Sequence, residues 1–462
     1  MRMKTIFHFT LLLLLQLGLP SSAQSFQSAQ PDSLKFLQWA PTPPMGWNSW
    51  DCYGPTVTEK EVKANADYMA HYLKKFGWKY IVVDIRWYVD NDKSHGYNEK
   101  NPVYCLDKYG RFIPSTVRFP SAANGKGFKL LADYIHRQGL KFGIHIMRGI
   151  PKIAVEKNTP ILHSPYHAAD IFNTDVLCKW LNDMYTVDAT KPGAQAYYNS
   201  LFDLYASWGV DFVKVDDLSR PYHKDEIELI RKAIDQCGRP IVLSTSPGET
   251  PIADAKHVES HANMWRIIDD FWDNWSEEKA HFALFEKWHP YVGIGHWPDG
   301  DMLPLGRIGI RSERGNDRFS QLTPDEQYTL ISLFSICKSP LIFGGDLPSN
   351  NAFTMSLITN PDVLNIDQHS VHNRLLLKDN DIYIWTADSP NGNKYLAIFN
   401  ARDNQKPQAV TVNRKLLGIK ASVEVTDLWS HKKVGVFGNE FSTKVSRHGV
   451  KLYRLNCKTN QK

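Results

Sequence analysis

A unit made of an amphipathic helix, a glycine and a short apolar strand recurs along the first part of the chain. The predicted helices, each followed by a glycine, cover 62–76, 128–138, 194–208 and 225–237. The apolar runs that follow cover 79–84, 141–145, 210–216 and 241–246. Strands without polar alternation are buried on both faces, which is typical of a parallel sheet. The repeated units predict an α/β fold, a (β/α)8 TIM barrel.

A doubly wound parallel sheet is the alternative fold for the same alternation of helices and strands. In such folds a phosphate-binding loop with the pattern Gly-x-Gly-x-x-Gly commonly follows an early strand. No early strand of this chain is followed by that pattern. The barrel is therefore the favoured prediction.

After about residue 360 the pattern changes to short alternating strands separated by turn residues. These strands are expected at 382–385, 395–399, 410–412, 423–425 and 449–455. Strands of this kind at short intervals predict a small C-terminal antiparallel β-sandwich. We therefore expect the barrel over 38–358 and the β-sandwich over 359–462.

The N-terminus has the composition of a secretory signal peptide. Arg2 and Lys4 precede the apolar stretch that contains Leu11–Leu15, and Ser21-Ser22-Ala23 is a small-residue cleavage site. The apolar stretch is too short to span a membrane. We expect residues 1–23 to be removed, residues 24–37 to be loose, and the mature protein to be secreted or periplasmic without membrane insertion.

Composition narrows the class of function. The chain has 462 residues, 42% of them hydrophobic and 22% charged, as in an ordinary globular protein. The net charge of +5, which falls to about +3 without Arg2 and Lys4, gives no reason to expect a nucleic-acid partner. Aromatic residues make up 12%, including 14 Trp, and aromatic faces suit sugar binding.

The six cysteines are widely spaced and show no zinc-ligand pattern. Most of them are expected to be buried free thiols. Cys105 and Cys178 both precede the strand at 210–216 in predicted barrel loops, and export permits disulfides. These two cysteines are therefore the expected pair if the chain forms a disulfide.

Carboxylates and tryptophans gather where the predicted strands end. Asp216 and Asp217 end one strand, Asp269 and Asp270 follow Trp265-Arg266, and a third loop reads Trp-Pro-Asp-Gly-Asp over 297–301. The carboxyl ends of barrel strands meet at one face, where active sites form. Cleavage of a glycosidic bond needs two carboxylates, one as nucleophile or base and one as acid. Each loop alone could be a helix cap, but three such loops favour catalysis.

Several motifs together resemble glycoside hydrolase family 27, which includes α-galactosidases and α-N-acetylgalactosaminidases. The resemblance covers nearly the whole mature chain. It rests on Pro44–Trp50 (Pro-Met-Gly-Trp-Asn-Ser-Trp), the strand ending at Asp84, Lys214-Val215-Asp216, Trp265-Arg266 to Asp270, Asp273-Asn274-Trp275, Asp299-Gly300-Asp301-Met302, Asp427-Leu428-Trp429 and His448-Gly449-Val450.

The resemblance implies a barrel, a retaining mechanism and a set of site residues. Asp216 would be the nucleophile and Asp270, rather than Asp269, the acid/base. Lys214 and Arg266 would keep nearby carboxylates ionised, whereas the acid needs a raised pKa. The expected substrate-binding residues are Trp47, Asp84, His145, Lys214, Ser246, Arg266 and Asp301. No cofactor and no metal is expected.

Four positions depart from the family pattern and bear on the substrate. Ile85 stands where galactosidases usually carry a second carboxylate, and His145 where many members carry Tyr. Leu218 replaces a common half-cystine. Ser246 replaces a Glu of the galactosidases and looks more like the N-acetylgalactosaminidase pattern.

We expect an exo-acting α-galactosidase-like enzyme that acts on terminal galactose-like residues of an oligosaccharide or polysaccharide. The alternatives within the family are an α-N-acetylgalactosaminidase and a β-L-arabinopyranosidase. A catalytically idle carbohydrate-binding protein is the rival from another class, but binding alone does not require both Asp216 and Asp270. The oligomeric state does not follow from the sequence.

Other polar side chains have no assigned role. His163 and His167, and His257 and His261, are spaced four apart, as metal ligands on a helix are. No third ligand is recognisable for either pair, so ordinary surface or core histidines are the favoured interpretation. Arg86 and Arg148 lie near strand ends, where an anionic sugar or, more simply, the barrel rim would hold them.

Overall fold

The computed structural model describes residues 32–404 and 406–457. The predicted signal peptide, residues 1–23, lies outside the described residues. The chain divides into two units, residues 1–35 and 36–462. Asp32–Trp39 forms a 3₁₀ helix, so the prediction of a loose segment to residue 37 is wrong from Asp32 onward.

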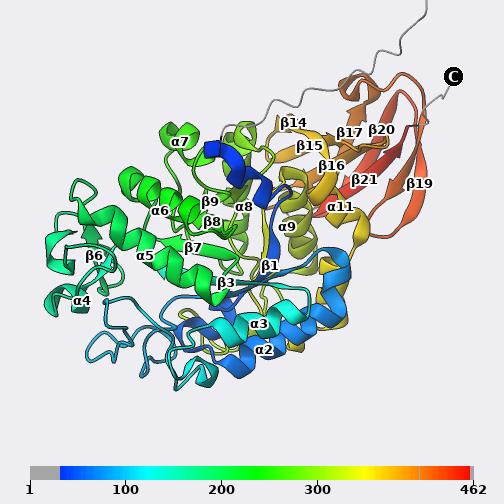
Figure 1. Ribbon diagram of the computed structural model, residues 1–462. Coiled ribbons are helices and arrows are strands. Elements are labelled where there is room, and N and C mark those ends of the chain that lie inside the picture. Colours follow the sequence, from blue (N-terminus) through cyan, green and yellow to red (C-terminus); the bar gives the residue numbers. More distant parts are fainter. Residues whose placement is uncertain (1–31, 405, 458–462) are drawn as a thin grey trace, which may run out of the picture. The chain divides into compact units, whose positions relative to one another are not determined.

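Eight parallel strands form the first sheet, and their order in space follows their order in the chain (Figure 1). They are β1 (Met45–Asn48), β2 (Tyr80–Val83), β3 (Lys141–Met147), β7 (Phe212–Asp216), β8 (Val242–Thr245), β9 (Met264–Arg266), β10 (Trp297–Asp299) and β13 (Leu341–Phe343). β13 pairs with β1, and Leu303, just past β10, bridges to Phe343 in parallel. The sheet therefore closes on itself, which confirms the barrel.

All four predicted helices are present, and further helices that the apolar spacing did not predict cover the barrel with them. Those over the barrel are α2 (Glu59–Tyr68), α3 (Lys129–Arg137), α5 (Gly193–Trp208), α6 (Lys224–Gln236), α7 (Ala255–Glu259), α8 (Trp275–Trp288), α9 (Pro324–Cys337), α10 (Ala352–Ile358) and α11 (Pro361–His369). Thr58 and Glu61 form the capping box of α2, whose predicted continuation to Phe76 has π and 3₁₀ geometry. No helix in the described part of the chain is long and apolar enough to cross a membrane.

Long loops at the carboxyl ends of the strands carry small structures that the apolar pattern does not predict. One holds β4 (Ile150–Pro151), α4 (Lys152–Glu156), β5 (Phe172–Asn173) and β6 (Met184–Val187). α1 (Trp50–Tyr53) follows β1, and another loop holds β11 (Arg307–Ile308) and β12 (Arg318–Phe319). These segments have only two to five residues each, too few to show a clear period.

The C-terminal part consists of antiparallel strands, as predicted. One sheet contains β14 (Val371–Asp379), β15 (Ile382–Asp388), β16 (Lys394–Asn400), β21 (Val450–Asn456), β18 (Val423–Asp427) and β19 (Lys432–Phe437). The other pairs β17 (Gln408–Asn413) with β20 (Glu440–Val445). Ile384, Ile398 and Val412 belong to the separate apolar core of these sheets.

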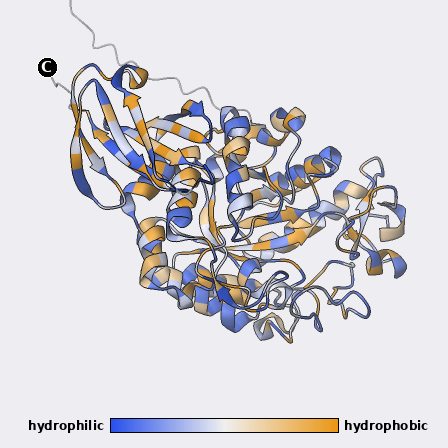
Figure 2. Cartoon of the chain, turned by 180° about the vertical axis from the view of Figure 1, so that it is seen from behind, coloured by the Kyte–Doolittle hydropathy of each residue, from blue (hydrophilic) through white to orange (hydrophobic). Residues whose placement is uncertain are grey.

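The C-terminal sheets contact the barrel helices through specific polar and aromatic groups. Thr329 of α9 donates a hydrogen bond of 2.7 Å to the carbonyl of His448. Trp429 donates one of 2.9 Å to Ser332, and the ring of His448 stacks on Trp275 at 3.7 Å. Figure 2 shows apolar residues concentrated along the strands, where the cores lie.

The glycine that ends α5 sets the entry into β7, which carries the central carboxylates. Gly209 has φ +82°, a left-handed conformation that costs an L-residue about 1–2 kcal/mol. We expect Gly209→Ala to lower the free energy of unfolding by that amount, measured by urea denaturation. Gly438→Ala is the matched control, because its Cβ would meet no atom within 4 Å. Equal stability of the two variants would contradict this account of the turn.

Candidate active site

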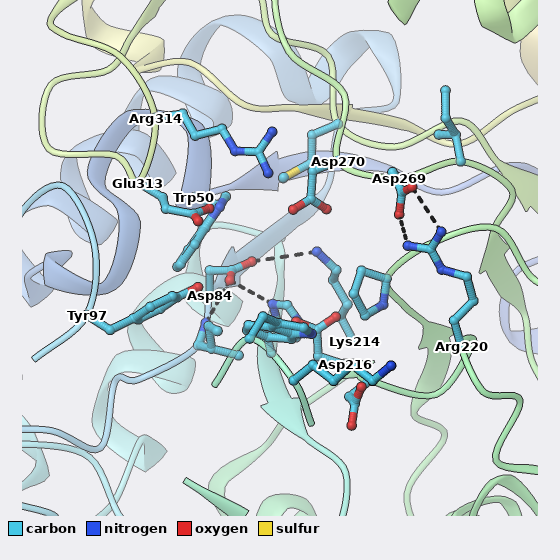
Figure 3. Close-up of a pocket in the computed structure, with 18 of the residues that line it drawn as sticks. Trp50, Asp84, Tyr97, Lys214, Asp216, Arg220, Asp269, Asp270, Glu313 and Arg314 are labelled. Atoms are coloured by element: carbon cyan, nitrogen blue, oxygen red, sulfur yellow. Dashed lines mark hydrogen bonds and ion pairs between the residues drawn. The ribbon is translucent and has the colours of Figure 1, made fainter. Parts of the chain in front are cut away.

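A cavity of about 1050 Å³ opens at the carboxyl ends of the barrel strands (Figure 3). The residues that line it come from the ends of β2, β3, β7 and β8 and from the loops that follow β1, β9 and β10. Those used below are Trp50, Asp84, Ile85, Tyr97, His145, Lys214, Asp216, Asp217, Asp269, Asp270, Glu313 and Arg314. The acidic residues predicted at separate strand ends therefore meet around one space.

Asp216, the last residue of β7, lies at the floor of this cavity and is 5% exposed. Its Oδ2 lies 3.4 Å from Nε2 of His145. Its Oδ1 is buried and accepts no hydrogen bond from the described residues. One carboxylate oxygen is thus held beside a cation while the other is free to act as a nucleophile.

Two cations flank Asp84, directly after β2. Nδ1 of His145 lies 2.7 Å from Oδ1 of Asp84, and Nζ of Lys214 lies 3.9 Å from Oδ2. Burial opposes ionisation of Asp84, but His145 and then Lys214 lower the pKa of its carboxyl group. Burial likewise opposes the charged His145, but Asp84 raises the pKa of the imidazole. The three side chains form a charge-compensated wall, in which Oδ2 of Asp84 is buried and accepts no hydrogen bond from the described residues.

Arg266, the last residue of β9, holds two further carboxylates. Its Nη2 lies 3.1 Å from Oδ1 of Asp270, and its Nη1 lies 2.7 Å from Oδ1 of Asp301. Asp301 also accepts a hydrogen bond of 2.9 Å from the backbone N–H of Phe271. The side chain of Asp270 is 36% exposed, whereas that of Asp301 is 2% exposed. Asp270 is therefore the member that can reach a substrate.

Of Asp270 and Asp301, the buried Asp301 is the carboxyl group that holds a proton more readily. Burial opposes ionisation of Asp270, but Arg266 and then Lys214 lower the pKa of that carboxyl group. Burial raises the pKa of Asp301 to about 7 against the pull of Arg266, and Asp270 adds to the rise. The sequence argument assigned a raised pKa to the acid itself. In the free site the raised pKa belongs instead to the partner of Asp270.

Arg148, directly after β3, contacts both the backbone and the side chain of Asp217, next to Asp216. Its Nε donates a hydrogen bond of 2.7 Å to the carbonyl of Asp217, and its Nη2 lies 2.9 Å from Oδ2 of the same residue. Its Nη1 pairs with Glu226 of α6 at 2.9 Å, and its backbone N–H donates to the carbonyl of Asp216. Asp217 has φ +63°, a strained backbone conformation for a residue other than glycine. The contacts with the Arg148 guanidinium hold Asp217 in that conformation. Burial raises the pKa of Asp217 to about 6.

Not every predicted substrate-binding residue lies on the cavity wall. Trp47 is fully buried in the barrel and donates from Nε1 to the carbonyl of Gly345 at 2.8 Å. Trp50, three residues later, lines the cavity instead, so the structure corrects the choice of tryptophan. Ser246 is also fully buried, and the cavity wall at that point is Pro247.

Arg266 and Asp301 are likewise not on the cavity wall. Arg266 contacts Asp270 and Asp301 directly, and the role of Arg266 and Asp301 in sugar binding stays a prediction from the family resemblance. Asp269 reaches the mouth of the cavity, where both of its oxygens pair with Arg220 (Figure 3). Because both oxygens of Asp269 are engaged in this ion pair, the structure agrees with the choice of Asp270 over Asp269 as the expected acid.

The cysteines and the other singled-out residues have structural surroundings. All six cysteines are free thiols, so the predicted pairing of Cys105 with Cys178 is wrong. Arg86 is fully buried and pairs with Asp183 and Asp92, each at 3.1 Å. Arg86 therefore belongs to the barrel rim and does not face a substrate.

Tyr97, Glu313 and Arg314 line the cavity but escaped the sequence analysis. Tyr97 stacks on Trp50 with ring centroids 5.9 Å apart. Glu313 and Arg314, on the loop after β11, also line the cavity (Figure 3). All of these residues except Trp50 sit in irregular loops, where neither period nor strand-end position marks a functional residue. Trp50 itself was visible in the Pro44–Trp50 motif.

A barrel with paired carboxylates in one cavity at its carboxyl face defines the class of glycoside hydrolases. The model of α-galactosidase A matches residues 180–369, and that of the α-galactosidase C-terminal β-sandwich domain matches residues 379–455. The chain belongs to glycoside hydrolase family 27.

The similar proteins include enzymes of three specificities. The structure of a family 27 β-L-arabinopyranosidase from Geobacillus stearothermophilus is 51% identical, covers 93% of this chain and 99% of its own, and has a TM-score of 0.90. A putative α-N-acetylgalactosaminidase from Bacillus halodurans is 48% identical, covers 90% and 97%, and has a TM-score of 0.82. The α-galactosidase of Cyamopsis tetragonoloba is 29% identical over 90% of this chain and 86% of its own.

The contacts that Arg148 makes beside Asp216 predict a defect in turnover when Arg148 is replaced. A lysine cannot reproduce the forked contacts of Arg148 with Asp217 and Glu226, and a shift of Asp216 by a fraction of an ångström disturbs attack. We expect Arg148→Lys to lower kcat about tenfold to a hundredfold with little change in KM, measured by steady-state kinetics. Arg220→Lys, at an exposed ion pair, is the control and should stay near wild type. Comparable losses in both variants would contradict this role of Arg148.

Proposed function

We propose that this protein is an exported, exo-acting, retaining glycoside hydrolase whose preferred substrates are terminal β-L-arabinopyranosides, with α-D-galactosides as poorer substrates. The observation that carries the choice of sugar is Ile85. It lines the cavity, is 1% exposed, and follows directly after the charge-compensated Asp84.

Ile85 favours a sugar without a hydroxymethyl group. A β-L-arabinopyranosyl unit has the ring of an α-D-galactosyl unit without its C6 hydroxymethyl group. The backbone N–H of Ile85 donates a hydrogen bond of 2.8 Å to Oδ1 of Asp84, which fixes the Asp84 carboxylate against the backbone of Ile85. If Asp84 binds ring hydroxyls, Ile85 presents an apolar surface where the C6 hydroxyl would need a partner. A buried hydroxyl without a partner costs binding free energy.

The proposed mechanism is a double displacement. Asp216 attacks the anomeric carbon with its free oxygen while Asp270 protonates the leaving oxygen, and a glycosyl-enzyme forms. Asp270 then removes a proton from water, which attacks the same carbon and restores Asp216. Before the first step Asp270 needs a proton. When bound substrate displaces water from the exposed side of Asp270, the loss of solvation favours the protonated, neutral form of its carboxyl group.

The other specificities have weaker support from the site. An α-N-acetylgalactosaminidase rests on the Ser246 pattern and on one similar structure, but Ser246 is buried away from the cavity wall. An α-galactosidase rests on relatives of lower identity. Export rests on the N-terminal pattern over residues 1–23, and sequencing the N-terminus of the protein from the culture medium or periplasm tests it.

The Ile85 argument predicts the order of substrates. We expect kcat/KM on nitrophenyl β-L-arabinopyranoside to exceed that on the α-galactoside and the α-N-acetylgalactosaminide. Ile85→Asp should raise activity on the galactoside about tenfold to a hundredfold, as one charge-assisted hydrogen bond allows. Ile85→Val, which keeps an apolar wall, is the control. A wild type that prefers the galactoside, with no gain from Ile85→Asp, would refute the proposed substrate.

The two catalytic carboxylates are distinguished by azide. Asp216→Ala should lose at least about a thousandfold in kcat, and azide should then yield a glycosyl azide of inverted configuration, because the small anion attacks the substrate directly. Asp270→Ala with azide should yield the retained product through the glycosyl-enzyme. NMR of the products reads the configuration, and Asp269→Ala should behave as wild type. An inverted product from the wild-type enzyme would overturn both roles.

A further inference from the structure

Two histidines and one glutamate form a side-chain cluster that joins α6 and α7, and Figure 1 shows these two helices on the outside of the barrel. His257 belongs to α7, His261 follows its end, and Glu228 projects from α6. One ligand atom from each of the three residues lies within 4.8 Å of the other two. The sequence showed only the two histidines, because Glu228 is on a separate helix.

The hydrogen bonds of the two rings indicate which ring nitrogens carry a proton and which are acceptors. Nδ1 of His261 lies 2.7 Å from the carbonyl of His257, and a carbonyl only accepts, so the neutral His261 carries its proton on Nδ1. Its Nε2 is then a bare acceptor. Nδ1 of His257 lies 2.6 Å from the hydroxyl of Tyr222, which can either donate or accept.

The side-chain atoms of this cluster include more hydrogen-bond acceptors than protons for them to accept. The Glu228 carboxylate and Nε2 of His261 are both acceptors, and only Nε2 of His257, 3.3 Å from Oε1 of Glu228, has a proton to share. The two rings stack with centroids 4.0 Å apart, and the neutral imidazole is the form of histidine that binds metals.

We propose that Glu228, His257 and His261 bind a divalent transition metal, Zn²⁺ by ligand type, with water in the fourth position. Two imidazoles and one carboxylate are ligands that Zn²⁺ takes, and the separation of 3.3 Å equals the edge of a tetrahedron with bonds of about 2.0–2.1 Å. Nδ1 of His261 already donates to a carbonyl, as the second nitrogen of a metal-bound histidine usually does.

Binding needs no net proton release. The proton of His257 moves from Nε2 to Nδ1, and the Tyr222 hydroxyl changes from donor to acceptor. Lys224 is the opposing charge, with its Nζ 4.0 Å from Oε1 of Glu228; its side chain is 56% exposed and can turn into solvent. The metal would staple α6 to α7 and, through Tyr222, hold the loop that carries Arg220 at the mouth of the active site.

The test uses the full chain without an affinity tag, stripped of metal by a chelator. We expect calorimetric titration with Zn²⁺ to give one site per chain, a rise in the thermal midpoint, and visible absorption bands of tetrahedral Co²⁺ when Co²⁺ replaces it. Glu228→Gln and His261→Ala should each weaken binding at least about tenfold. Lys224→Gln should strengthen it, because a competing cation is removed.

His71→Ala, at an exposed histidine elsewhere, is the matched control and should leave the titration unchanged. Glu228 is half-exposed, so its variant tests the ligand without disturbing the core. Absence of a one-to-one site in the wild type, octahedral Co²⁺ bands, or binding that survives both Glu228→Gln and His261→Ala would overturn the proposal. Because the readouts are binding and stability, their failure leaves the glycosidase assignment intact.

Discussion

The structure depends on the compensation of buried negative charge at one end of the barrel. Asp84, Asp216 and Asp301 are almost fully buried, and the free energy of removing three carboxylates from water is large unless cations share the site. Lys214 and His145 stand between Asp84 and Asp216. Together with Arg266 at the end of β9, they keep carboxylates of the site ionised, while burial favours the protonated form of Asp301.

The barrel makes this arrangement possible because each charged group comes from a different strand end. His145 and Lys214 lie inside β3 and β7, which pair directly at these two residues. Rigid neighbouring strands fix the separation of the cations and carboxylates more closely than loops can. The loops and the short helix α1 supply the rest of the cavity wall, which includes Trp50, Tyr97, Ile85, Asp269 and Arg220.

The elements with strong periodicity were predictable from the sequence, and those whose character depends on distant partners were not. The helices and strands around β7 follow from apolar spacing and glycine stops. β19 is exposed along five of its six residues, so it has no apolar pattern to reveal it. Asp216 and Asp270 came from strand-end position and family resemblance together.

Other parts of the site required the fold. Trp47 and Trp50 belong to one motif, and only the turn into α1 decides which of them faces the cavity. The role of Arg148 depends on Glu226, 78 residues away, and the metal cluster depends on Glu228, 29 residues from His257. No short-range spacing encodes such contacts.

The most direct test of the account is to trap the covalent intermediate. The enzyme is incubated with a 2-deoxy-2-fluoro-β-L-arabinopyranosyl fluoride, digested and analysed by peptide mass spectrometry. The account predicts one fluorosugar per chain, attached to Asp216, and no labelling of Asp216→Ala. Attachment to Asp217 or Asp270, or turnover of the reagent without any covalent adduct, would contradict the assignment of Asp216 as the nucleophile of a retaining enzyme.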